Sequence, residues 1–168
     1  TGFSVKRRNI MFEVNVNAPL DLSLAAAPAM VTAGEGWIVN LSSGSANHWA
    51  GPPTPFEPTS VNISAYGASK AALNTMTLSF ARNLGPEIRA NVVCPAMVTG
   101  RWWLEHLGEE KYEAQFNSFA NSTPLKRRVN PENIASAVAW LIEGADAVTG
   151  QVLVVDAGAS LGAPVHRK

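Results

Sequence analysis

The 168-residue sequence predicts an α/β protein built on a small parallel sheet, and two observations support this. Three short apolar runs, at residues 36–44, 88–95 and 149–158, have the length of buried strands. Continuously apolar strands are typical of parallel sheets, because helices cover both of their faces. The segments between the runs carry apolar residues at helical spacing. We therefore expect about three strands with flanking helices.

Composition indicates a single domain and excludes several classes of partner. Hydrophobic residues make up 46% of the chain and charged residues 15%, which is enough to bury a core. Thirteen basic and thirteen acidic residues cancel, which argues against nucleic acid or a membrane surface as a partner. No apolar run approaches the ~18 residues of a membrane span. Cys94 is the only cysteine and cannot form a disulfide within the chain, so we expect a cytoplasmic protein.

The first helical pattern covers residues 9–30. Its apolar stripe comprises Ile10, Val14, Leu20, Leu24 and Ala27. Pro19 lies inside the pattern and predicts a local kink. Asn15 is a poor residue for a helix interior, so it has a hydrogen-bonding role, is a satisfied core amide, or lies at the surface.

The next predicted helix, over residues 65–84, begins with a tyrosine and a lysine. On a helix Tyr66 and Lys70 are four residues apart and lie on one face, with the ammonium near the phenol. A neighbouring cation stabilises a phenolate, which suits a tyrosine that exchanges a proton near neutral pH. A lone Tyr-x-x-x-Lys is more often an ordinary solvated pair, so the other motifs must decide whether this pair is functional.

These motifs together resemble the catalytic and C-terminal half of the short-chain dehydrogenase/reductase family. The Tyr66–Lys70 pair and the three apolar runs occur in the family's order, and the resemblance extends from about residue 9 to residue 161. It implies a partial doubly wound, Rossmann-like parallel sheet. It also implies an NAD(P)-dependent alcohol dehydrogenase or carbonyl reductase, acting on a small-molecule alcohol or carbonyl substrate.

The resemblance assigns four catalytic roles. Tyr66 would exchange the proton with the substrate oxygen, and Lys70 would assist it and hold the nicotinamide ribose. Ser43, the second serine of the Ser-Ser pair after the first strand, would orient the substrate oxygen. Asn15, in the context Val-Asn-Val, would order a water that relays protons to the lysine.

The resemblance also implies NAD or NADP as cofactor, and no metal. Pro95, Val98 and Thr99 follow the second strand and match the family loop that holds the nicotinamide carboxamide, although Ala96 replaces the usual glycine. Together with Tyr66 and Lys70 they are the predicted cofactor-binding residues.

Two further segments are expected beside this site. Residues 101–121, here called the lid region, match the family's variable substrate lid and are rich in aromatic residues. Residues 47–63 form a proline-rich loop. Its aromatic residues either line the substrate pocket or only pack the loop against the rest of the protein. The family further implies a homo-oligomer formed through helices 9–30 and 65–84.

The sequence lacks the glycine-rich βα unit that binds pyrophosphate in this fold. We therefore expect residues 1–168 to be one incomplete domain of a truncated chain that binds the cofactor weakly when alone. Two alternatives stay open: a non-catalytic fragment or partner subunit, and a lyase or dehalogenase relative of the same fold. The retained Lys70 argues against the second.

Overall fold

Strand β2 (Ile88–Pro95) is the centre of the fold, which in the computed structural model is described for residues 4–46 and 61–162. It pairs in parallel with β1 (Gly36–Leu41) on one side and β3 (Val152–Val155) on the other, giving the order β1-β2-β3. The predicted three-stranded parallel sheet is therefore confirmed. Residues 47–60 of the predicted proline-rich loop and the tail from Ala163 lie outside the described residues, whereas residues 61–63 are helical and not part of a loop.

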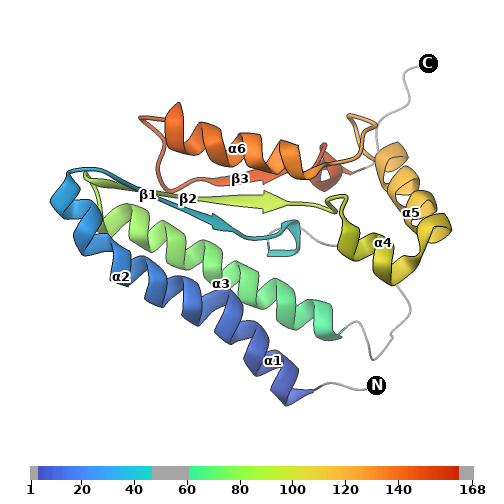
Figure 1. The fold of residues 1–168 in the computed structure, drawn as a ribbon, viewed down its shortest axis with the longest axis horizontal. Helices are drawn as coiled ribbons and strands as arrows, with labels where there is room; N and C mark the ends of the chain where they lie inside the picture. The colour runs from blue at the N-terminus through green and yellow to red at the C-terminus, as the bar shows by residue number, and fades with distance from the viewer. Residues whose placement is uncertain (1–3, 47–60, 163–168) are drawn as a thin grey trace.

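Helices cover both faces of this sheet (Figure 1). On one face α2 (Ala18–Ala33) and α3 (Val61–Asn83) enclose a core. That core comprises Ala27, Ile38, Phe80, Ile88 and Ala90. On the other face α6 (Pro131–Glu143) packs over a second core, which comprises Val93, Val129, Ile134, Leu141, Ala145 and Ala157.

Strand β1 is less covered than the sequence predicts. Ile38 is buried on the α2–α3 side and Val39 packs against the α6-side core. Because side chains alternate across a strand, Trp37 and Leu41 share the face of Val39. They are nevertheless 37% and 50% exposed. Among the described residues β1 has a neighbouring strand on one side only, so the expectation of full burial on both faces is wrong for this strand.

The first helical segment is longer than predicted and contains a wider turn. It runs through α1 (Val5–Phe12), a π-helical turn at Glu13–Asn17, and α2. Pro19 follows directly in the first turn of α2, and a residue without an N–H is compatible with a locally widened turn.

The π turn also divides the predicted apolar stripe. The π turn adds a residue to the helical repeat, so side chains before it are rotated relative to those after it. Ala27 is buried, whereas Ile10, Val14 and Leu24 are exposed. The single continuous stripe predicted for this segment is therefore wrong.

The helices α4 (Arg101–Leu107) and α5 (Glu109–Ser122) lie at the carboxyl ends of the strands. The lid region forms α4 and most of α5, beyond the end of β2 (Figure 1). At the start of helix α6, Asn130 and Asn133 form a capping box and Pro131 lies in the first turn. No helix among the described residues is long and apolar enough to cross a membrane.

Candidate active site

The Tyr66–Lys70 pair lies where α3 crosses the carboxyl end of β1. The ammonium Nζ of Lys70 donates a hydrogen bond to the backbone oxygen of Leu41, 2.8 Å away, and lies 5.9 Å from the centre of the Tyr66 ring. Burial lowers the pKa of Lys70, although the nearby thiol of Cys94 opposes this effect. Among residues 4–46 and 61–162 the phenol hydroxyl has no hydrogen-bond partner.

The two serines after β1 have different roles. Ser42 is buried, and its hydroxyl donates to the backbone oxygen of Lys70 at 3.1 Å. Ser43 is half-buried, and its oxygen accepts a hydrogen bond from the amide of Ser45 at 3.2 Å. Because that contact uses only the oxygen, the hydroxyl hydrogen of Ser43 remains available for a substrate. The geometry therefore distinguishes a structural serine from a candidate functional one.

Gly67 allows the turn that carries Ser43 to approach the tyrosine. The turn Gly44–Ala46 packs against α3, and a Cβ on Gly67 would lie 2.8 Å from the backbone oxygen of Ser45. That distance is a clash with backbone, so the turn would have to move. The glycine beside Tyr66 thus sets how closely the serine turn lies against the helix.

Asn15 is connected to the tyrosine through a residue that the sequence did not single out. The side-chain amide of Asn15 donates to the hydroxyl of Ser69 at 3.0 Å, and this hydroxyl donates to the backbone oxygen of Tyr66 at 2.8 Å. Asn15 lies in the π turn, which directs its side chain toward α3. The amide thus has a protein partner, and its role in a proton relay stays a prediction. We call Asn15, Ser42, Ser43, Tyr66, Ser69 and Lys70 the Tyr66 corner.

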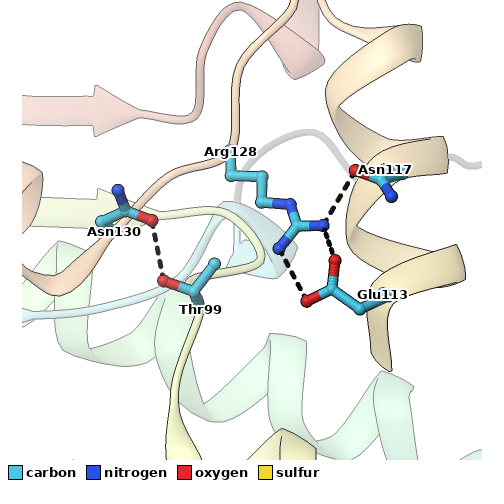
Figure 2. A network of polar contacts seen from close by, with 5 residues as sticks. All are labelled: Thr99, Glu113, Asn117, Arg128 and Asn130. Carbon is cyan, nitrogen blue, oxygen red and sulfur yellow. Dashed lines mark hydrogen bonds and ion pairs between the residues drawn. The ribbon is translucent and has the colours of Figure 1, made fainter. Parts of the chain in front are cut away.

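The loop after β2 is tied to the segment that precedes α6. Val98 forms a parallel bridge with Val129, and the amide of Thr99 donates to the backbone oxygen of Val129 at 2.9 Å. The hydroxyl of Thr99 donates to the side-chain oxygen of Asn130 at 2.8 Å (Figure 2). The Thr99 oxygen still has acceptor capacity, as a carboxamide N–H would require.

A groove of about 630 Å³ opens between the ends of β1 and β2 and helix α6. It is lined mainly by apolar residues, namely Leu41, Pro95, Val98, Pro131, Ile134, Ala135, Val138, Ala139, Ile142 and Glu143. Two predicted cofactor-binding residues, Pro95 and Val98, therefore share one apolar wall. Leu41, whose backbone oxygen holds Lys70, lies on the same groove. Mainly apolar grooves of this kind are typical of small-molecule and cofactor sites.

The lid region holds a cluster of aromatic side chains. Trp103 meets Trp102 edge-on at 4.9 Å and Phe116 at 6.2 Å between ring centres. Tyr112 packs on Phe116 at 4.6 Å, and His106 lies over Trp102 at 4.2 Å. Phe116 is fully buried while Trp102 is exposed, so one part of this cluster is a packing core and another part is open to a ligand.

No group of histidine, cysteine, aspartate and glutamate suited to a metal ion exists among residues 4–46 and 61–162. The buried Asp156 has another role. Burial alone would raise its pKa, but hydrogen bonds from Ser160 and Gly158 outweigh burial and hold that pKa below its usual range. Its carboxylate thereby fixes the turn that follows β3.

The fold agrees with what the chain resembles among known proteins. A family model described as enoyl-(acyl carrier protein) reductase matches residues 3–160. The chain belongs to the short-chain dehydrogenase/reductase family, whose members among its relatives are oxidoreductases.

Individual relatives are moderately similar. The short-chain dehydrogenase/reductase homolog YusR of Bacillus subtilis is 33% identical over 137 residues, covering 82% of this chain and 93% of that protein. The 7alpha-hydroxysteroid dehydrogenase of Clostridium sardiniense is 34% identical over 144 residues, covering 84% of this chain and 50% of that enzyme. The solved structure of Thermoplasma acidophilum aldohexose dehydrogenase aligns with a TM-score of 0.84 at 29% identity, over 99% of this chain and 64% of that one. Apart from the Bacillus homolog, the chain spans about half the length of the hydroxysteroid dehydrogenase and of several other curated relatives.

Proposed function

We propose that the chain carries the catalytic half of an NAD(P)-dependent alcohol dehydrogenase or carbonyl reductase. The observation that carries this proposal is the Tyr66 corner. There a half-buried lysine is held beside a tyrosine whose hydroxyl has no partner among the described residues. A serine with an available hydroxyl hydrogen lies on the turn packed against the same helix.

In the reductive direction, each group has a separate task. Ser43 donates a hydrogen bond to the substrate carbonyl oxygen and orients it. Tyr66 transfers its hydroxyl proton to that oxygen as hydride reaches the carbonyl carbon, so that a carbonyl becomes an alcohol. The positive charge of Lys70 stabilises the phenolate that remains. Asn15 supports this geometry through Ser69 and, with an ordered water, would return a proton toward the lysine.

The cofactor would supply the hydride, and this chain would bind its nicotinamide end. Lys70 keeps donors beyond the one given to Leu41 and is suited to the ribose hydroxyls. Pro95 and Val98 would form the apolar wall beside the nicotinamide ring, and the Thr99 oxygen would accept from the carboxamide. Affinity for the pyrophosphate depends on backbone donors of a glycine-rich turn, which these 168 residues lack.

A titration tests this proposal together with turnover. We expect calorimetry to show weak or no binding of NADH and NADPH to the 168-residue chain alone. We expect binding and turnover once a relative's glycine-rich βα unit is joined to its N-terminus (the joined protein). Lys70→Met should reduce both in the joined protein, whereas Lys6→Met, on the exposed face of α1, should change neither. Tight binding by the chain alone, or equal loss in both variants, would contradict the proposal.

The substrate class is proposed from the lid region and from the relatives. An aromatic wall favours a sizeable apolar or ring-bearing substrate, and one relative acts on hydroxysteroids by its name. The joined protein should therefore be tested on a 7-hydroxysteroid and on a β-ketoacyl thioester. Trp102→Ala should change their relative kcat/KM by ~10-fold or more, because one ring in a pocket is worth ~1–3 kcal/mol of discrimination. An unchanged ratio would leave Trp102 with a packing role only.

We also propose a homo-oligomer formed through helices 9–30 and 65–84, in the cytoplasm. The support lies in apolar side chains exposed on these helices among the described residues: Ile10, Val14, Leu22, Leu24, Val31 and Leu78. Light scattering of the purified protein should give more than one chain per particle. Leu22→Glu should shift the mass toward the monomer, and a monomeric wild type would overturn this part of the proposal.

A further inference from the structure

Arg128 joins the lid region to the loop that carries Thr99. Its guanidinium donates to the carboxylate of Glu113, at 3.2 Å for one of the two hydrogen bonds, and to the side-chain oxygen of Asn117 at 2.8 Å (Figure 2). Both partners lie on α5. The same guanidinium carbon lies 6.0 Å from the ring centres of Tyr112 and Phe116, so its flat face also covers the lid aromatics.

The two residues that follow Arg128 hold the predicted nicotinamide loop. Val129 is buried, forms the bridge with Val98 and accepts the amide of Thr99. Asn130 accepts the Thr99 hydroxyl. Three consecutive residues therefore bind α5 on one side and Thr99 on the other. Any displacement of α5 that carries Arg128 with it must move the acceptors of Thr99.

A second contact links the same two elements. The side-chain amide of Gln115 donates to the sulfur of Met97 at 3.6 Å, and Met97 precedes Val98 in the loop. This is a weak contact, and it cannot fix an orientation as a forked guanidinium–carboxylate pair does. The Arg128–Glu113 pair is thus the directional connection between lid and loop.

We propose that Arg128 is a positioning residue that couples the lid region to the nicotinamide loop, so that α5 and Thr99 take up their positions together. A substrate that seats α5 would thereby also align the cofactor-facing loop, and a loosened α5 would release it. The catalytic consequence rests on the proposed function. The mechanical coupling itself does not, and it can be measured in the chain without cofactor.

Amide hydrogen exchange of the full 168-residue chain tests the coupling directly. The Thr99 amide reports on the bond to Val129, and in the described part of the chain Glu113 has no hydrogen bond or ion pair with residues 96–99. Glu113→Gln should therefore raise exchange both in α5 and at Thr99, by about two- to fivefold, the range expected for loss of an exposed ion pair. Arg128→Met should do the same. Exchange in β2 should stay unchanged.

Two further variants separate coupling from a local structural role. Arg127→Met removes the neighbouring charge, which has no hydrogen-bond or ion-pair partner in the described part of the chain, and should leave Thr99 exchange unchanged. The swapped pair Glu113→Arg with Arg128→Glu should restore Thr99 protection lost in either single variant. If α5 loosens while Thr99 exchange stays at its wild-type value, or if all amides including β2 change alike, the coupling is overturned.

The catalytic consequence has its own measurement. In the joined protein, Arg128→Met should raise KM. The increase should be at least about twofold larger for the bulkier of the two substrates than for the smaller one. The kcat for the smaller substrate should be retained. Equal changes for both substrates would refute the catalytic role of the coupling. If no reductase activity is found at all, the proposed function fails, while the exchange result still decides the coupling.

Discussion

In the Tyr66 corner Lys70 and Ser42 are anchored to the backbone of another element, whereas the ion pairs of the lid region join side chains that are partly or largely exposed. Lys70 is bonded to the backbone of Leu41, and Ser42 is bonded back to the backbone of Lys70. In the lid region Arg101 pairs with Glu105, with side chains 87% and 58% exposed, and Arg128 holds α5 through Glu113.

The two regions therefore differ in how they respond to substitution. Backbone acceptors are fixed by the secondary structure, so the corner keeps its geometry as long as β1 and α3 stay packed. Exposed ion pairs contribute little to stability and can be replaced at low cost. Substitutions in the lid region should therefore leave the groups proposed to move the proton undisturbed.

A pair of glycine substitutions should show the largest contrast. Gly67→Ala would place a Cβ 2.8 Å from the backbone oxygen of Ser45, so the serine turn must shift, at a cost of about 1–3 kcal/mol. Gly100→Ala, at the start of α4, would meet nothing within 4 Å and needs no unusual backbone angle. Thermal unfolding should show destabilisation for the first variant only. Equal effects would mean that the Tyr66 corner is packed no more tightly than the lid region.

Serine hydroxyls should show a smaller contrast of the same kind. Ser69 is fully buried, and Ser69→Ala removes the acceptor of Asn15 and the donor to the Tyr66 backbone, at a net cost of about 1 kcal/mol. Ser118→Ala, on the exposed side of α5, should change the free energy of unfolding by less than about 0.5 kcal/mol. Denaturant unfolding measures both, and a neutral Ser69→Ala would remove the Asn15–Ser69–Tyr66 connection from the account.

The smallest effect should come from pH. The hydrogen bond from Arg128 lowers the pKa of Glu113, while burial acts weakly in the opposite direction. A carboxylate with a depressed folded-state pKa gives its stabilisation above the ordinary glutamate value, and this is lost as pH falls through the folded value. Exchange in α5, corrected for its intrinsic pH dependence, should therefore rise relative to β2 below about pH 4.3. Glu113→Gln should abolish this rise and Glu35→Gln should not.

The fold could be predicted from the sequence because its determinants are local. Three apolar runs gave the strands. Tyr66 and Lys70 were found by their helical spacing. Ser43 was assigned by resemblance alone, and the structure separates it from Ser42 by its hydrogen bonds.

What the sequence did not predict depends on contacts between distant residues. Ser69 meets Asn15 across 54 positions, and only the packing of the π turn on α3 creates that bond. Arg89 donates to three backbone oxygens at the end of α6, of Leu141, Ile142 and Ala145, and nothing near it in the sequence indicates this. A polar residue acquires such a role from its tertiary neighbours.

The proton donor assigned to Tyr66 is the claim on which the rest depends. Single-turnover reduction of a carbonyl substrate by the joined protein, in wild type and in Tyr66→Phe, measures that step directly. The phenylalanine ring keeps the packing and removes only the hydroxyl, which has no partner to lose among the described residues. We expect the rate of the chemical step to fall ~10²–10⁴-fold with an unchanged free energy of unfolding. An equal rate in both proteins would contradict the assignment.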